Sequence, residues 1–196
     1  MGLSIHYNGR INPAASLKAM VDEIKDIAEI NSWKYFVFAD EFPPNTVGKI
    51  EYNENIYGIC FSPPQCEPVW LSFLSNGRMS CPPNLQYWSN TDDLEQKEFL
   101  YMLSTKTQYA GIDVHKFIIH LLQYIAPKYL KDFNLSDEGK YWETGDEDLL
   151  KEIFDRYTFY IDSFGSALQS TPIKKGENLE NFITRIANQV KKKGKK

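Results

Sequence analysis

The sequence predicts an α+β fold: a β-α-β start followed by an antiparallel meander, with three or four helices packed mainly on one face of the sheet. Residues 56–61 and 69–74 are apolar, rich in aromatic and β-branched side chains, and of strand length. A Pro-rich turn segment, residues 62–68, separates them, and the Asn76-Gly77 pair after them is typical of a tight turn. The second half of the chain instead places its apolar residues at helical spacing.

The first elements follow from local patterns. Apolar and polar residues alternate over residues 3–7, which predicts a half-buried strand. Asn12 and Pro13 suit the cap and the first position of a helix, whose apolar stripe begins at Leu17. Residues 33–38 form a second predicted strand, and residues 49–52 are a further candidate edge strand.

Helices dominate the rest of the chain. The short apolar run at residues 99–107 fits a strand or a buried helix, and Thr105 and Thr107 favour the strand. A helix begins at Asp113, and Pro127 is expected to end it. Thr144 and Glu147 match a capping box that opens the next helix, and a last helix spans residues 179–190. We expect a single α+β domain over residues 1–190 and a basic flexible tail at residues 191–196.

Composition excludes several classes of function. The net charge of −4 and the pI of about 5.5 disfavour a nucleic-acid-binding protein. No run of 18 apolar residues and no signal peptide occur, so neither membrane insertion nor secretion is expected. The three cysteines form no CxxC pair, which fits a reduced, cytoplasmic protein.

No cofactor and no metal site is predicted. His115 and His120 are five residues apart, which turns them about 140° from each other on a helix. The Gly-rich phosphate-binding motifs and the GxSxG elbow are absent. Cys66 lies in a Pro-bounded loop where a thiol could be exposed, but nothing in the sequence places a base beside it.

Two functions remain open, and whether the protein is an enzyme is left undecided. The first is a non-catalytic binding or interaction protein. Its candidate binding residues are Tyr141, Trp142, Glu143 and Asp146, because aromatic anchors beside acidic groups suit a basic protein partner. The alternative is a small, hydrolase-like enzyme with a polar pocket between the sheet and the Asp113 helix. Its candidate catalytic residues are Glu67, Lys106, His115 and Glu143.

Two segments of the chain, residues 58–79 and 137–146, together resemble an uncharacterised family of bacterial cytoplasmic proteins. They carry the sequences Gly-Ile-Cys-Phe-Ser-Pro-Pro-Gln-Cys-Glu and Phe-Leu-Ser-Asn-Gly-Arg-Met in the first, and Asp-Glu-Gly-Lys-Tyr-Trp-Glu-Thr-Gly-Asp in the second. The resemblance implies a bacterial source. That family has no established activity, so the resemblance implies no substrate, cofactor or site residue.

Overall fold

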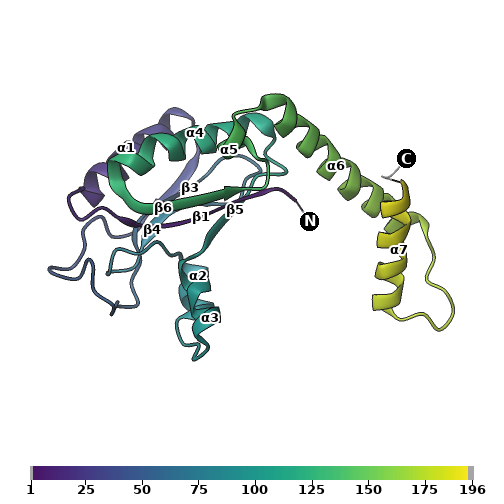
Figure 1. Cartoon of the computed structure of the whole chain (residues 1–196), viewed down its shortest axis with the longest axis horizontal. Coiled ribbons are helices and arrows are strands. Elements are labelled where there is room, and N and C mark those ends of the chain that lie inside the picture. The colour runs from purple at the N-terminus through teal and green to yellow at the C-terminus, as the bar shows by residue number, and fades with distance from the viewer. Residues whose placement is uncertain (1, 194–196) are drawn as a thin grey trace.

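Two three-stranded antiparallel sheets form the centre of the protein (Figure 1). The structure is a computed structural model, and it describes residues 2–193. The first sheet has the order β5-β1-β6, with strands β5 (Leu103–Lys106), β1 (Ser4–Ile11) and β6 (Leu130–Asp137). The second has the order β2-β3-β4, with strands β2 (Lys34–Val37), β3 (Tyr57–Ser62) and β4 (Val69–Phe73).

The helices are distributed unequally around the sheets. In Figure 1 the long helices α1 (Leu17–Ile30) and α4 (Ile112–Tyr129) lie over one side, and α2 (Pro82–Trp88) and α3 (Leu94–Lys97) project from the other. The 3₁₀-helix η1 (Glu98–Tyr101) leads into β5. The remaining helices are α5 (Tyr141–Thr144), α6 (Glu147–Ser170) and α7 (Leu179–Lys193). The α+β prediction is confirmed. The strands divide between two sheets, however, and the predicted packing of three or four helices on one face is not confirmed.

The predicted central hairpin forms as expected. Strands β3 and β4 pair antiparallel, with Cys60 opposite Trp70. Asn76 and Gly77 then turn the chain back, because the N–H of Leu74 bonds to the carbonyl of Arg78. Gly77 adopts a φ of 82°, a conformation that glycine reaches without strain.

Several predicted boundaries were wrong. Helix α1 is capped by Ser16, whose hydroxyl accepts the N–H of Ala19, while Asn12 closes a preceding turn. Helix α6 is capped by Asp146 rather than by Thr144. Pro127 lies inside α4, which continues to Tyr129 before the chain enters β6 directly.

Three segments differ in kind from the prediction. Strand β6 was not predicted at all, although it is one of the two strands that pair with β1. Residues 99–107 divide between η1 and β5, so the strand preference was right only for its second part. Residues 49–52 form no strand.

One hydrophobic core joins both sheets to α1, α4 and the first half of α6. Tyr7 of β1 stands at the junction, where its hydroxyl accepts the N–H of Trp70 at 2.8 Å. Thr105 of β5 donates its hydroxyl to the carbonyl of Pro68 at 2.9 Å. Burial raises the pKa of Tyr7 well above its ordinary value, so the phenol stays neutral in this junction.

Helices α6 and α7 form an arm that extends from the sheets (Figure 1). The apolar side chains Phe182, Ile186 and Val190 of α7 are buried, and α7 packs against α6. Residues 191–193 of the predicted tail belong to α7, and residues 194–196 lie outside the described residues. Among residues 2–193, no helix combines the length and the apolar character that crossing a membrane requires.

Replacing Gly58 with alanine should destabilise the fold much more than the same change at Gly48. Both glycines have positive φ, 108° and 86°, but a Cβ at Gly58 would collide with the carbonyl oxygen of Leu71, whereas a Cβ at Gly48 meets nothing within 4 Å. The backbone strain costs about 1–2 kcal/mol at either site, and overpacking at Gly58 adds about 1–3 kcal/mol. Urea unfolding of G58A and G48A measures the difference. Equal losses of stability would contradict the close approach of β3 and β4.

The carboxyl group of Glu177 should titrate far below its ordinary range. The Arg185 guanidinium, bonded to it at 2.7 and 2.8 Å, and the backbone N–H of Lys174 lower the pKa of Glu177 to about 2. This contact therefore stabilises the arm above the ordinary pKa of 4.5 and is lost as the pH falls through about 2. Carboxyl ¹³C NMR measures the titration, and R185M should return it towards 4.5. An ordinary pKa in the unsubstituted protein would contradict the contact.

Candidate functional site

The exposed face of the β5-β1-β6 sheet is polar. Along β1, Ile5 and Tyr7 point into the core, so the intervening His6, Asn8 and Arg10 point to the opposite face. The strand register places polar partners beside them: His6 lies between Ser104 and Ser136, and Asn8 lies opposite Asn134. This face, on the side of the sheet away from the core, can therefore contact a polar ligand or partner.

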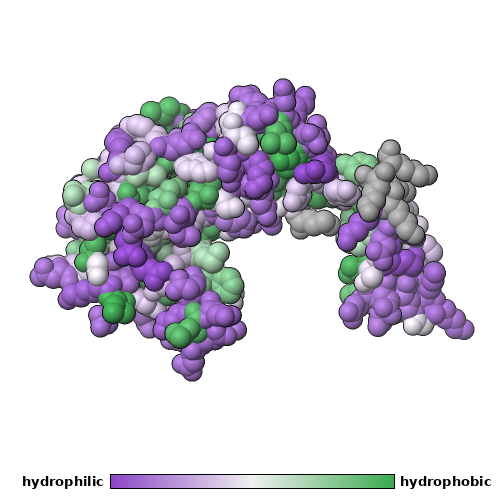
Figure 2. Space-filling model, viewed as in Figure 1, coloured by the Kyte–Doolittle hydropathy of each residue, from purple (hydrophilic) through white to green (hydrophobic). Residues whose placement is uncertain are grey.

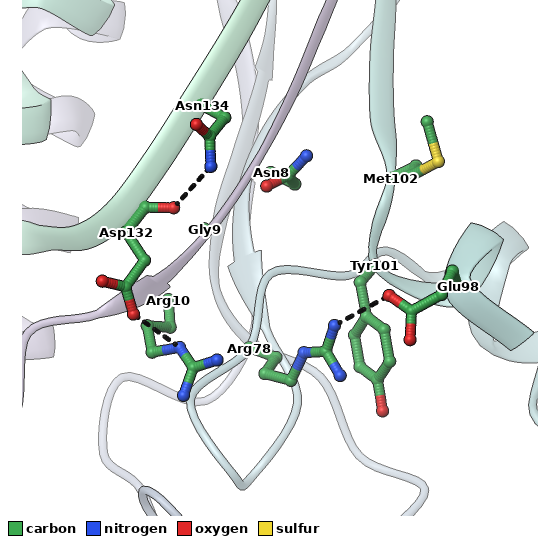
Figure 3. Close-up of a pocket in the computed structure, with 9 residues that line it drawn as sticks. All are labelled: Asn8, Gly9, Arg10, Arg78, Glu98, Tyr101, Met102, Asp132 and Asn134. Carbon is green, nitrogen blue, oxygen red and sulfur yellow. Dashed lines mark hydrogen bonds and ion pairs between the residues drawn. The ribbon is translucent and has the colours of Figure 1, made fainter.

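A pocket of about 320 Å³ opens at one end of this face (Figure 3). Strands β1 and β6 supply one side of it, and the turn after β4, η1 and Met102, the residue before β5, supply the other. Its charged residues are Arg10, Arg78, Glu98 and Asp132. The pocket thus combines two guanidinium groups with two carboxylates, and the amides of Asn8 and Asn134 complete its polar lining.

The fold brings the two arginines together through the main chain. Ile11 donates its N–H to the carbonyl of Gly77 at 2.8 Å, and Met79 donates to the carbonyl of Gly9 at 2.9 Å. These bonds make Arg10 and Arg78 antiparallel bridge partners. Like charges placed directly opposite each other on neighbouring strands are destabilising. The pairing of the two arginines therefore lowers the stability of the fold unless another group balances their positive charge.

Each arginine has a carboxylate beside it, but the contacts are loose and exposed. Arg10 lies 3.3 Å from Asp132, and Arg78 lies 3.3 Å from Glu98. The two carboxylate side chains are 58% and 66% exposed. Exposed pairs of this kind contribute about 0–1 kcal/mol. Each contact joins one nitrogen to one oxygen, whereas a guanidinium has five N–H donors. Donors of both arginines therefore remain for a ligand.

Tyr101 fixes the position of Arg78. The guanidinium carbon of Arg78 lies 3.2 Å from the centre of the Tyr101 ring, which is a close cation–π contact. Figure 3 shows Arg78 between Arg10 and Tyr101, with Glu98 beyond it. Stacking restricts the freedom of the long side chain before any ligand arrives, so less entropy is lost on binding.

A β-bulge shapes the other side of the pocket. Between the pairs Asn8–Asn134 and Arg10–Lys131, β1 has one residue, Gly9, where β6 has two. Asp132, one of the two, adopts a φ of 52°, which is uncommon for a residue with a side chain. Bulges re-aim side chains and occur often beside functional sites. Here the bulge places the Asp132 carboxylate beside Arg10.

The four predicted catalytic residues form two pairs. Glu67 and Lys106 adjoin at the edge of β5, where the carboxylate accepts the Lys106 N–H at 3.0 Å and lies 3.8 Å from its ammonium group. His115 and Glu143 are linked through Asp137. The Asp137 carboxylate contacts the His115 ring, and Glu143 accepts the backbone N–H of Asp137 at 3.3 Å. None of the four lines the pocket between Arg10 and Arg78.

His115 lies in the interior, and its side chain is 0% exposed. Its Nδ1 is 2.7 Å from the Thr107 hydroxyl, and its Nε2 is 3.1 Å from the Asp137 carboxylate. Burial alone would raise the pKa of Asp137, but the contact with His115 and backbone N–H donors outweigh it, and this pKa lies below its usual value. An ionised carboxylate only accepts, so Nε2 of His115 carries the proton. A substrate cannot reach this histidine.

The predicted binding segment is only partly exposed. Tyr141 is buried, and Trp142 is half-buried against the core. Both donate their backbone N–H groups to Asp137. Asp146 is exposed but caps α6 by accepting the N–H of Leu149. Tyr141 is therefore not an exposed anchor, while the binding role of Glu143 and Asp146 stays a prediction.

Two further chemistries find no support among the described residues. Burial, and then the charge of Glu67, raises the pKa of Cys66 to about 12, so the group is a thiol at neutral pH. Within residues 2–193, no group of three or more His, Cys, Asp or Glu side chains could hold a metal ion.

The pocket itself was not predicted from the sequence. The alternation predicted over residues 3–7, if continued along the strand, would place Asn8 and Arg10 on one face, and this was the available signal. Arg78, in the predicted Asn-Gly turn, carried no sign of its proximity to Arg10. Asp132 and Asn134 lie on the unpredicted strand β6.

Comparisons with models of protein families, with curated proteins and with solved structures found no match to this chain. The function is therefore argued from the geometry of the site.

Replacing His115 with alanine should destabilise the protein by about 3 kcal/mol or more, because it leaves the buried Asp137 carboxylate without the ring N–H that it accepts. His120 provides a matched control on the same helix. It is exposed and forms one side-chain contact, 3.2 Å from the Tyr141 hydroxyl, so H120A should cost about 1 kcal/mol or less. Urea unfolding measures both. A stable H115A protein would show that His115 is not a structural residue.

Proposed function

We propose that the protein is a non-catalytic binding protein, and that its pocket between Arg10 and Arg78 binds an anionic group, a carboxylate or a phosphate, of a protein partner. The observation that carries the proposal is the placement of the two arginines as bridge partners at the pocket. Arginine binds carboxylate and phosphate groups through paired N–H donors. A bound anion would also relieve the repulsion between the two guanidinium groups.

The charges inside the pocket do not oppose such a ligand strongly. Asp132 and Glu98 are exposed, and their contacts with the arginines contribute little, so both side chains can swing into water when an anion arrives. An anion placed between Arg10 and Arg78 can accept hydrogen bonds from both guanidinium groups at once, whereas Asp132 contacts only Arg10 and Glu98 contacts only Arg78.

The size of the pocket favours one small group over a whole cofactor. Sites for small molecules commonly measure about 300–1,000 Å³. At about 320 Å³, this pocket lies at the lower end of that range. The neighbouring polar face, with His6, Ser104 and Ser136, offers further hydrogen-bonding groups to the partner that presents the anion.

The hydrolase-like alternative has less support. Its only candidate base with a suitable ring nitrogen, His115, is entirely buried, and both of its nitrogens already have partners. Glu67 and Lys106 contact each other beside β5, whereas His115 and Glu143 both contact Asp137.

NMR titration with inorganic phosphate and, separately, with acetate tests the proposal. The side-chain Nε–H signals of Arg10 and Arg78 should shift and saturate in the unsubstituted protein. R78M should weaken phosphate binding about tenfold or more, because it removes at least one charge-assisted hydrogen bond. K106M removes a cation from β5 outside the pocket and should leave the affinity unchanged.

The two titrations also separate the sources of the anionic group. Saturation by phosphate alone indicates a phosphorylated partner, and saturation by acetate indicates a carboxylate. Shifts that do not saturate, or that are equal in R78M and in the unsubstituted protein, would refute the proposed site.

A further inference from the structure

Helices α6 and α7 leave an apolar groove open between them. Only the first half of α6 joins the main core, through Leu150, Ile153 and Phe154. Farther along, the arm stands away from the sheets (Figure 1). In this two-helix arm, each helix packs against only one other helix. Apolar side chains outside that contact are therefore exposed to solvent.

The groove has a volume of about 440 Å³. Its apolar lining comes from both helices: Tyr157, Tyr160 and Phe164 of α6, and Ala187 and Val190 of α7. Its charged residues are both basic, Arg156 and Lys191. Neither forms an ion pair within residues 2–193. An occupant that fits it carries an apolar side chain flanked by acids.

The opposite end of the molecule carries such a segment, which we call the acidic tip, residues 87–98. It exposes Leu94 by 79% and Tyr87 by 71%. In the sequence, Asp92 and Asp93 precede Leu94 and Glu95 follows it; all three acids are exposed, and Lys97 is the one base of the segment. An exposed apolar side chain between acids is a candidate for insertion into an apolar groove with a basic rim.

The shape of the molecule allows this contact between two copies. Figures 1 and 2 show an arch, with α2 and α3 at one end and α7 at the other, both extending to the same side of the sheets. A two-fold axis through the opening of the arch would bring the acidic tip of each copy to the groove of the other. Such a contact is closed, so it would stop at a dimer instead of forming a fibre.

We propose that the protein forms a two-fold symmetric dimer in which the acidic tip of each copy docks into the α6–α7 groove of the other, with Leu94 in the groove and Asp92 and Glu95 near Arg156 and Lys191. Opposite charges orient and speed such an association. The charges are exposed, so salt should weaken the dimer.

Sedimentation equilibrium of the full chain provides the first measurement. The chain has a mass of 22.7 kDa, and a species of twice that mass should form at micromolar concentration. Two double variants then reverse the charges: R156E/K191E in the groove and D92K/E95K in the tip. Each should weaken dimerisation about tenfold or more, since like charges would then face each other. Circular dichroism checks that both variants keep their helices.

Mixing the two variants provides the decisive test. In the mixed pair, an acidic groove faces a basic tip, and a basic groove faces an acidic tip. Both contacts are complementary again, so an equimolar mixture should restore the dimer although neither variant dimerises alone. The single change L94S, made without the charge reversals, should also weaken the dimer, although it alters no charge.

Either of two results would overturn the proposal. One is a monomer at all concentrations up to about 200 μM, which lies well above the dissociation constants of stable interfaces. The other is a mixture of folded variants that stays monomeric, because an interface elsewhere on the molecule would not respond to paired charge reversal.

Discussion

The buried pair of His115 and Asp137 is the interaction on which the arrangement of the second half of the chain depends. Asp137 ends β6 and accepts hydrogen bonds from His115 of α4 and from the backbone N–H groups of Gly139, Tyr141 and Trp142. A buried carboxylate is tolerated only when its hydrogen bonds are complete. These contacts hold α4, β6 and α5 in one geometry, and α5 in turn sets where α6 begins.

The same network explains why a residue that looks catalytic in the sequence is structural. A histidine near the start of a helix, with a hydroxyl and an acid within reach, has the composition of a catalytic triad. The two roles differ in whether a substrate can reach the histidine. Here Leu150 and Phe154 of α6 pack in the core and close off His115, and the Phe154 ring lies 5.5 Å from the His115 ring. That helix lies more than 30 residues farther along the chain, so the sequence around His115 could not show its burial.

The sequence predicted most elements whose patterns are local. The β3–β4 hairpin, the Asn76-Gly77 turn after β4 and the apolar stripe of α1 each depend on neighbours within a few residues. Strand β6 was missed because its bulge interrupts the two-residue alternation that identifies a strand. Pro127 was expected to end α4, yet the helix continues for two more residues, and the N–H of Leu130 after it still bonds to the carbonyl of Ala126. The pocket could not be predicted, because Arg10 and Arg78 are 68 positions apart in the sequence. The main-chain bonds that bring them together could form between any residue types.

The central strand β1 also imposes an order on folding. Its partners β5 and β6 lie far along the chain: Ser4 pairs with Lys106 and Ile5 pairs with Asp137, separations of 102 and 132 residues. Contacts between distant residues slow folding, to the order of milliseconds to seconds. A ribosome adds roughly 5–20 residues per second. For several seconds, then, the newly made β1 has neither of its neighbours, and both of its edges can pair with other chains. The strand that organises the finished sheet is therefore also a segment of the nascent chain that is exposed to aggregation during synthesis.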